Sequence, residues 1–199
     1  MVAVRHSRFA SPVRACARLG SYGRETLLLT LRRFQSHEQR TTDVSAVYDS
    51  AEISNNPVLV DRFGVVAVNS ALEVDVYGHV NSTHVNGCRM INGISGSDDF
   101  TRNALLSIIA LPSTAGDVSR VVPMVPHVDH TEHDVDVIIT EHGVADLRGR
   151  SPRERATSLV ENCAHPDFQP ALRRYLEKAN RQGGYEPHVL ERSFSWNDE

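Results

Sequence analysis

The strongest constraint on the fold is a series of short apolar runs between residues 65 and 140, separated by turn-forming residues. Residues 65–68 (Val-Val-Ala-Val) and 108–111 (Ile-Ile-Ala-Leu) each hold four apolar residues, a length typical of buried strands. Residues 118–125 and 135–140 have a similar character and predict two more buried strands. The series therefore predicts a sheet.

Two segments between these runs have other patterns. In residues 72–77, apolar and polar or aromatic positions alternate (Leu-Glu-Val-Asp-Val-Tyr), which predicts a strand with one wet face that Gly78 ends. Residues 100–107 suit a short helix.

After residue 150 the pattern becomes helical. Ser151 and Glu154 form a capping box with proline at the first helical position, which predicts a helix start. Apolar residues then recur at helical spacing to Cys163, and a second stripe runs from Phe168 to Ala179 before two glycines. Strands followed by helices predict an α/β fold, with an open sheet and helices packed on it.

The first forty residues differ in composition from the rest of the chain. They carry eight arginines against Glu25 and Glu38, a balance of 8 − 2 = +6, whereas the whole chain of 199 residues has a net charge of −4. An Arg- and Ser-rich, acid-poor start is typical of a transit peptide, but we favour a poorly ordered leader, a truncation scar or a mis-assigned start. We expect residues 1–42 to form a leader and residues 43–199 one domain.

Composition also argues against several classes of protein. An acidic body is a poor partner for nucleic acid, because phosphate contacts need a basic face. No run approaches the roughly 18 to 20 apolar residues that cross a bilayer, so no membrane partner is expected. Three cysteines without a CxxC pair argue against a disulfide framework and fit a reducing, cytoplasmic location.

A glycine turn is the first candidate site. Gly93 and Gly96 allow close backbone approach, and Ser97 or Asp98 can cap the helix that follows. Main-chain N–H groups at such a start favour negative charge, and a carbonyl oxygen that becomes negative only during reaction fits the acidic surroundings better than a phosphate. A plain strand-to-helix turn is the alternative.

Three histidines form the second candidate. His127, His130 and His133 are spaced three apart with acids between them, which invites a zinc or iron site. Nearby prolines disfavour a helix, however, and on a strand positions 127 and 130 point to opposite faces. We expect a hydrogen-bonded polar turn and no metal.

Asn55 and two carboxylates complete the candidates. Asn55 and Asn56 precede a proline and are turn formers by default, but an amide can also donate to a developing oxyanion if it faces the glycine turn. Glu73 and Glu141 occupy strand or strand-end positions from which a carboxylate could act as nucleophile or base, with a solvated or salt-bridged acid as the alternative.

A set of short motifs gives the chain a family resemblance. In order they are EISNNP (52–57), ALEVDVYG (71–78), VNSTH (80–84), NG (92–93), VPMV (122–125), HVDHTEHD (127–134), TE (140–141), ADLRG (145–149), CAHP (163–166) and FSW (194–196). Together they resemble the C-terminal domain of the acetyl-CoA hydrolase/transferase family, which includes acetate and 4-hydroxybutyrate CoA-transferases, over residues 46 to 196.

The resemblance implies a fold and a chemistry. Members have two similar open α/β domains and move CoA between carboxylic acids through a glutamyl-CoA thioester, or pass the acyl group to water. It implies acyl-CoA and a short carboxylate as substrates, with no bound cofactor. It assigns oxyanion stabilisation to Asn55 and Gly96, and places Gly93 with them at the CoA-binding turn.

Two departures from the family pattern qualify this expectation. Ser95 and Asp98 stand where the family's turn is richer in glycine. No upstream acid lies in a recognisable version of the nucleophile motif, and we expect the N-terminal domain to be missing. We therefore expect a partial chain that works beside a polypeptide supplying the N-terminal half, or as a homo-oligomer. The alternatives are a degenerate fragment or assembly partner and, less favoured, a histidine-based metallohydrolase.

Overall fold

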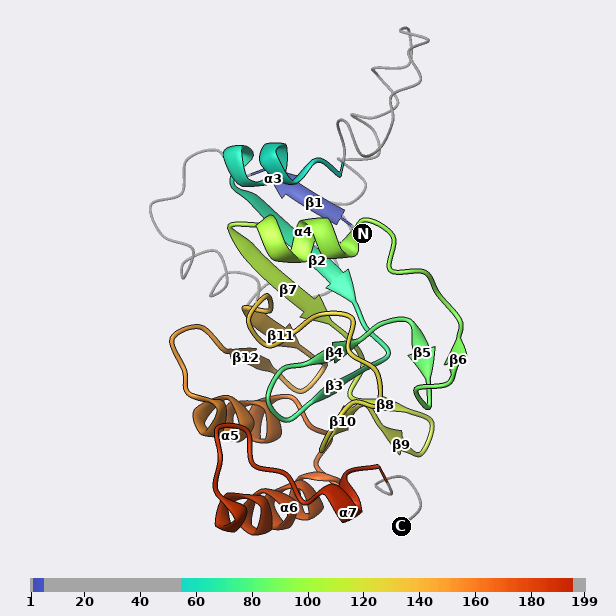
Figure 1. The fold of residues 1–199 in the computed structure, drawn as a ribbon, viewed down its shortest axis with the longest axis vertical. Helices are drawn as coiled ribbons and strands as arrows, with labels where there is room; N and C mark the ends of the chain where they lie inside the picture. The colour runs from blue at the N-terminus through green and yellow to red at the C-terminus, as the bar shows by residue number, and fades with distance from the viewer. Residues whose placement is uncertain (1, 6–54, 195–199) are drawn as a thin grey trace, which may run out of the picture.

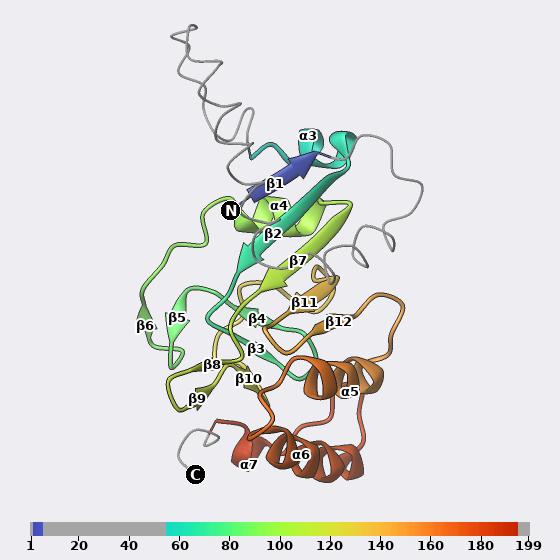
Figure 2. The same ribbon diagram turned by 180° about the vertical axis from the view of Figure 1, so that it is seen from behind.

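The computed structural model describes residues 2–5 and 55–194, and its main feature is a five-stranded sheet (Figures 1 and 2). The strand order is β1-β2-β7-β11-β12. The strands are β1 (Val2–Arg5), β2 (Val65–Ser70), β7 (Leu106–Ala110), β11 (Val137–Ile139) and β12 (Val144–Asp146). The central strands β2, β7 and β11 are parallel, and the two edge strands are antiparallel to their neighbours. A mixed α/β fold with an open sheet is confirmed.

A second, smaller sheet lies beside the first. Its order is β10-β3-β4, from Val121–Val122, Glu73–Asp75 and Val80–Asn81. Two short hairpins accompany it: β5 (His84–Val85) with β6 (Arg89–Met90), and β8 (Thr114–Ala115) with β9 (Val118–Ser119). These short strands leave most of the region to turns, which present polar side chains.

Helices pack at both ends of the large sheet (Figure 1). The first pair, α3 (Pro57–Phe63) and α4 (Ser97–Asn103), packs on β2 through Val60 and Phe100, which share an apolar cluster with Val65 and Ala67. At the other end, α5 (Pro152–Asn162) packs against β12, α6 (Gln169–Gln182) packs against α5, and α7 (Leu190–Ser193) follows.

The largest apolar cluster joins the two sheets to α5 and α6. It includes Val74, Ile138, Leu147, Leu159 and Leu172, each fully buried. Full burial of one such side chain stabilises the fold by about 1.5–3 kcal/mol. The cluster therefore holds the two sheets against α5 and α6. Within the described part of the chain, no helix is both long and apolar enough to span a bilayer.

The helical predictions for the second half of the chain are confirmed. The main-chain N–H of Ser151 donates to a carboxylate oxygen of Glu154 at 2.8 Å, and Pro152 occupies the first helical position of α5. The stripe from Phe168 onward forms α6, whose buried residues are Leu172, Tyr175 and Ala179. Gly183 ends this helix with φ of 77°.

The predicted one-sided strand at residues 72–77 is wrong in part. Only Glu73–Asp75 pairs as β3, and both Asp75 and Tyr77 are buried rather than wet. The cause is a turn that a sequence period cannot show. One carboxylate oxygen of Asp75 accepts the N–H groups of Tyr77, Gly78 and His79, each at 3.0 Å. The hydroxyl of Tyr77 donates to the carbonyl of Pro187, far along the chain.

Two further predicted elements have different bounds in the structure. The helix expected over residues 100–107 begins at Ser97 and ends at Asn103, because the following residues enter β7 beside β2. The single strand expected over residues 118–125 divides into β9 and β10. The former pairs within a hairpin, whereas the latter pairs with β3, so the chain changes partner at Arg120.

Candidate active site

Asn55 and Gly96 lie in contact, although forty residues separate them in the sequence. Asn55 precedes α3, which is capped by the Asn56 side chain accepting the N–H groups of Val58 and Leu59 at 3.0 and 3.3 Å. Gly96 is the N-cap residue of α4. A Cβ built on Gly96 would lie 2.4 Å from Nδ2 of Asn55 and 2.6 Å from its Cγ, so a side chain at position 96 would collide with the amide. The structure therefore brings these two predicted site residues together.

Gly93, the third predicted site residue, is placed differently. It is exposed, and a Cβ built on it would meet no atom of the described residues within 4 Å. Ser95, between the two glycines, has φ of 53°, a left-handed conformation that costs a residue with a Cβ about 1–2 kcal/mol. The turn thus holds its shape with a serine where glycine would be unstrained.

The start of α4 lacks the predicted side-chain cap. The Ser97 hydroxyl donates to the carbonyl of Ile94 at 2.6 Å, and no side chain in the described part of the chain caps the helix. Asp98 lies 3.5 Å from the guanidinium of Arg102, one turn further along α4. The extra carboxylate at this turn is therefore partly compensated by a cation on the same helix.

Helix α4 is tied to the large sheet by a buried pair of polar side chains. The Asn69 amide, on β2, donates to the Thr101 hydroxyl at 2.9 Å, and both residues are buried. A buried hydrogen bond of this kind fixes position, because breaking it leaves a polar group unsatisfied at a cost of about 1–3 kcal/mol. It holds α4, and with it Gly96, at a defined place on the sheet.

His130 lies beneath the Gly96 turn and was not predicted to do so. Its side chain is 1% exposed, its Nε2 is 3.4 Å from Oγ of Ser97, and its Nδ1 is 4.0 Å from a carboxylate oxygen of Asp98. Since the Ser97 hydroxyl donates to Ile94, His130 is the donor to Ser97. Burial lowers the pKa of His130, which keeps the ring neutral.

The spacing of the three histidines did not reveal this placement, because strand pairing decides it. Main-chain hydrogen bonds of 2.9 and 3.2 Å join His130 to Val80 and point its ring inward. His133 is 74% exposed and pairs with Glu132 at 2.9 Å, while His127 packs against His84 with ring centroids 3.8 Å apart. The structure does not bring the three together, so they form no joint metal site.

The two candidate carboxylates are engaged outside this turn. Glu73 accepts the Asn81 amide at 2.7 Å, and burial raises the pKa of Glu73. Glu141 accepts the main-chain N–H of Ser113 at 2.8 Å; burial opposes ionisation, but the hydrogen bonds from Ser113 outweigh it and lower the pKa of Glu141. The upstream acids Glu25, Glu38, Asp43, Asp49 and Glu52 lie outside the described residues.

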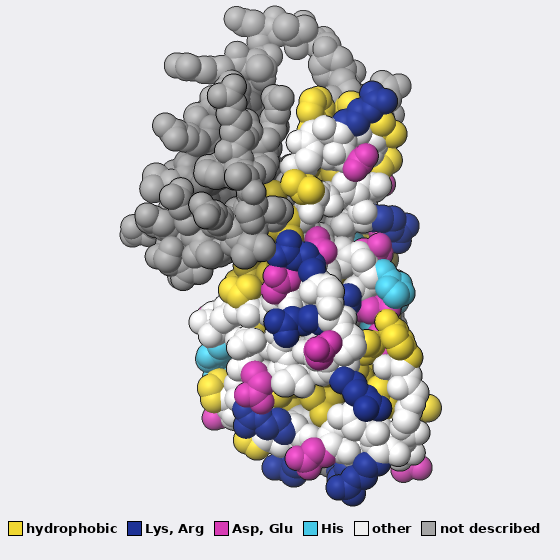
Figure 3. Space-filling model, turned by 90° about the vertical axis from the view of Figure 1, so that its left-hand side faces the viewer, with side chains coloured by type: hydrophobic (Ala, Val, Ile, Leu, Met, Phe, Trp, Pro, Cys, Tyr) yellow, Lys and Arg dark blue, Asp and Glu magenta, His cyan; other side chains and the backbone are white. Residues whose placement is uncertain are grey.

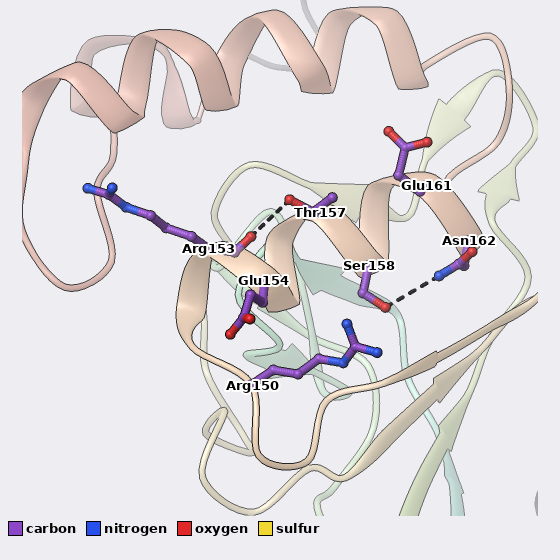
Figure 4. Close-up of a pocket in the computed structure, with 7 residues that line it drawn as sticks. All are labelled: Arg150, Arg153, Glu154, Thr157, Ser158, Glu161 and Asn162. Carbon is purple, nitrogen blue, oxygen red and sulfur yellow. Dashed lines mark hydrogen bonds between the residues drawn. The ribbon is translucent and has the colours of Figure 1, made fainter.

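A hollow beside α5 lies apart from the residues of the Gly96 turn (Figure 4). Its lining residues are Arg150, Arg153, Glu154, Thr157, Ser158, Glu161 and Asn162. The face that carries α5 and α6 mixes acidic and basic side chains (Figure 3). The lining holds no histidine, cysteine or buried carboxylate, so it offers no general base or nucleophile of those kinds.

Comparisons with known proteins agree with this architecture. The family model for the acetyl-CoA hydrolase/transferase C-terminal domain matches residues 35–176. Over 148 residues the chain is 60% identical to a succinyl-CoA:acetate CoA-transferase of Clostridium kluyveri, covering 73% of this chain and 28% of that protein. It is 51% identical to an acetyl-CoA hydrolase of Kluyveromyces lactis, covering 74% of this chain and 30% of that protein.

A solved structure extends the likeness to three dimensions. RipA from Yersinia pestis shares 36% identity with a TM-score of 0.54, covering 62% of this chain and 28% of that one. An α/β domain with this motif series is of the CoA-transferase type. The chain belongs to the acetyl-CoA hydrolase/transferase family, as a C-terminal domain of that family. It spans about 30% of the length of the curated relatives it matches.

Proposed function

We propose that this chain supplies the oxyanion-stabilising and CoA-facing part of an enzyme that transfers CoA between short carboxylic acids or hydrolyses short acyl-CoA thioesters. The observation that carries the proposal is the contact between Asn55 and Gly96 at the start of α4. An amide side chain and a helix-start backbone in contact offer N–H donors to one small volume. The names of the relatives support the same chemistry.

The proposed role follows from charge development. When a carboxylate or water attacks a thioester carbonyl, the carbonyl oxygen becomes negative. The Nδ2–H of Asn55 and the main-chain N–H of Gly96 donate to that oxygen, while Gly93 leaves room for CoA along the turn. Such donors act because they are fixed before the reaction, and loss of one typically costs about 10²–10³ in kcat.

The nucleophile is the second part of the proposal. Carboxylate attack on the thioester conserves the energy of that bond, and the family resemblance implies a glutamate in this role. Neither Glu73 nor Glu141 is placed at the turn, so we assign the nucleophile to the N-terminal half of the active site. A separate polypeptide that carries the N-terminal half would supply it, in the cytoplasm, with acyl-CoA and a short carboxylate as substrates and no bound cofactor.

A chimeric enzyme tests the proposed site. Residues 52–199 would replace the matching segment of the Clostridium kluyveri CoA-transferase, to which this chain is 60% identical over 148 residues. We expect the chimera to exchange CoA between acetyl-CoA and succinate. A folded chimera without exchange or hydrolysis would favour the alternative of a degenerate fragment or assembly partner.

The isolated chain tests the need for a second half. Purified chain mixed with acetyl-CoA and succinate should show no CoA exchange above the uncatalysed rate. Rapid exchange by the chain alone would contradict the assignment of the nucleophile to another polypeptide. It would leave the role of Asn55 and Gly96 standing, because the two measurements are independent.

A further inference from the structure

Two histidines and an aspartate converge away from the Gly96 turn, where β5 meets the loop of residues 123–130. They are His84, His127 and Asp129, and one potential ligand atom from each lies within 4.8 Å of the other two. The imidazole rings of His84 and His127 face one another with centroids 3.8 Å apart. A nitrogen of His127 lies 3.2 Å from a carboxylate oxygen of Asp129. Two imidazoles and a carboxylate are a donor set that suits zinc and its neighbours in the first transition row.

The hydrogen bonds of Thr83 fix which nitrogen of His84 is free. The Thr83 hydroxyl donates its single proton to Asp129, from which it lies 2.8 and 2.9 Å. It lies 2.6 Å from Nδ1 of His84 and must therefore accept a proton from that nitrogen. His84 is thus held as the Nδ1–H tautomer, with the lone pair of Nε2 unprotonated. This is the arrangement by which proteins orient a metal-binding histidine through its other nitrogen.

Asp129 is held in place by several hydrogen bonds. The main-chain N–H of Ser82 donates to it at 2.7 Å, and the hydroxyls of Ser82 and Thr83 add further hydrogen bonds. The carboxylate therefore has a defined position beside two imidazoles.

A second group of a histidine and two carboxylates, His79 with Glu132 and Glu186, is arranged as an ion-pair cluster rather than as a ligand set. His79 has Glu132 3.2 Å from Nδ1 and Glu186 3.0 Å from Nε2, so both nitrogens face carboxylates. Despite partial burial, Asp75, Glu186 and Glu132 raise the pKa of His79. Each nitrogen of His79 already faces a carboxylate, which makes this group an ion-pair cluster. Of these two groups, the one around His84 is therefore the better candidate for a metal site.

We propose that His84, His127 and Asp129 bind one divalent first-row metal ion, with Zn²⁺ the best match for two imidazoles and one carboxylate. Zinc bonds of about 2.0–2.2 Å in a tetrahedron hold ligand atoms roughly 3.4 Å apart, so the three side chains would close on the ion from positions in which their ligand atoms lie within 4.8 Å of one another. Three protein ligands leave a fourth position for water or another small ligand. The ion ties hairpin β5–β6 to the loop that carries His127, and it does not depend on the proposed CoA chemistry.

Metal titration of the full chain tests the proposal. Chain stripped with a chelator and dialysed is titrated with ZnCl₂ by calorimetry and with CoCl₂ by visible absorption, since tetrahedral cobalt absorbs strongly. We expect a saturable site of one ion per chain, with a cobalt spectrum of low coordination number. Absence of saturable binding, or an octahedral cobalt spectrum only, overturns the proposal.

Variants assign the ion to its ligands. His84→Gln and His127→Gln should each abolish this site. Thr83→Val, which keeps the shape of the side chain but removes the tautomer-fixing hydroxyl, should weaken binding about 10- to 100-fold. His133→Gln and Cys88→Ser remove an exposed histidine and an exposed thiol outside the proposed ligand set and should leave affinity unchanged. Circular dichroism checks folding. Binding that survives both histidine replacements, or that disappears in Cys88→Ser, places the ion elsewhere and overturns the proposal.

Discussion

The Asn55 side chain occupies the space that a Cβ at residue 96 would need. A Cβ at Gly96 would lie 2.4, 2.6 and 2.8 Å from Nδ2, Cγ and Oδ1 of Asn55, closer than nonbonded atoms approach. Gly96 has φ of −79°, which any residue can adopt, so space rather than backbone conformation requires glycine here. The contact couples two segments, the chain before α3 and the turn before α4.

This coupling predicts a non-additive pair of variants. Gly96→Ala should lower the free energy of unfolding by about 1–3 kcal/mol, because the new methyl overpacks against the Asn55 amide. In an Asn55→Ala background the same change should cost much less, since the colliding atoms are gone. Urea unfolding of the four proteins measures the difference, and additive costs would contradict the observed contact.

Helix α5 depends on its first turn. Ser151→Ala should lower the free energy of unfolding by about 0.5–2 kcal/mol, because it removes the hydroxyl that donates to Glu154 at 2.7 Å in the capping box. Thr157→Ala is a matched control on the same helix, where an exposed hydroxyl donates to the carbonyl of Arg153. Equal effects of the two changes in chemical denaturation would argue against the cap.

Asp75 predicts a pH-dependent stability. Burial raises the pKa of Asp75 to about 6, whereas an aspartate in the unfolded chain has a pKa of about 3.9. The folded state therefore favours the protonated acid. Its contribution is complete below about pH 3.9 and is lost as the pH rises through about 6.

Asp75→Asn isolates this contribution. The amide can still accept the three main-chain N–H groups but carries no charge. The stability of the variant relative to the parent should rise by up to about 3 kcal/mol between about pH 4 and pH 7. Unfolding curves at several pH values measure it, with Asp117→Asn, at an exposed position, as control. A pH-independent difference would exclude a raised pKa.

The two described cysteines should differ in reactivity. Burial raises the pKa of Cys163 to about 12, and its thiol lies among the residues packed between β11 and α5. Cys88 is exposed. Because the thiolate is the reactive form, iodoacetamide should label Cys88 in the native protein and Cys163 only after unfolding. Peptide mass spectrometry distinguishes the sites, and rapid native labelling of Cys163 would show that the core around it opens.

The sequence predicted the elements that local chemistry determines. The capping box at Ser151, the two amphipathic helices and the buried strands at residues 65–68 and 108–111 all depend on short-range patterns. The turn at Asp75 was missed because a buried aspartate that accepts three N–H groups has the same two-residue period as a wet strand face. The strand over residues 118–125 was overextended because pairing partners change at Arg120.

The candidate site was predictable only in part. Asn55 and Gly96 were candidates from their residue types, and a family resemblance assigned them their role. Their contact depends on the parallel strands that carry α3 and α4 to one end of the sheet. His130 was missed because its inward position comes from pairing with Val80, which its own segment does not encode. For the same reason the histidine that packs against His127 is His84, forty-three positions earlier, rather than another histidine of its motif.

The central claim is that Asn55 donates to the oxyanion formed when a thioester is attacked. The most direct measurement is the steady-state kinetics of CoA transfer by the chimera and its Asn55→Ala variant, with Thr157→Ala as a control outside the site. Loss of this donor should lower kcat about 10²–10³-fold while the KM for acetyl-CoA changes little, because the interaction strengthens only as charge develops. An unchanged kcat in a folded variant would contradict the account.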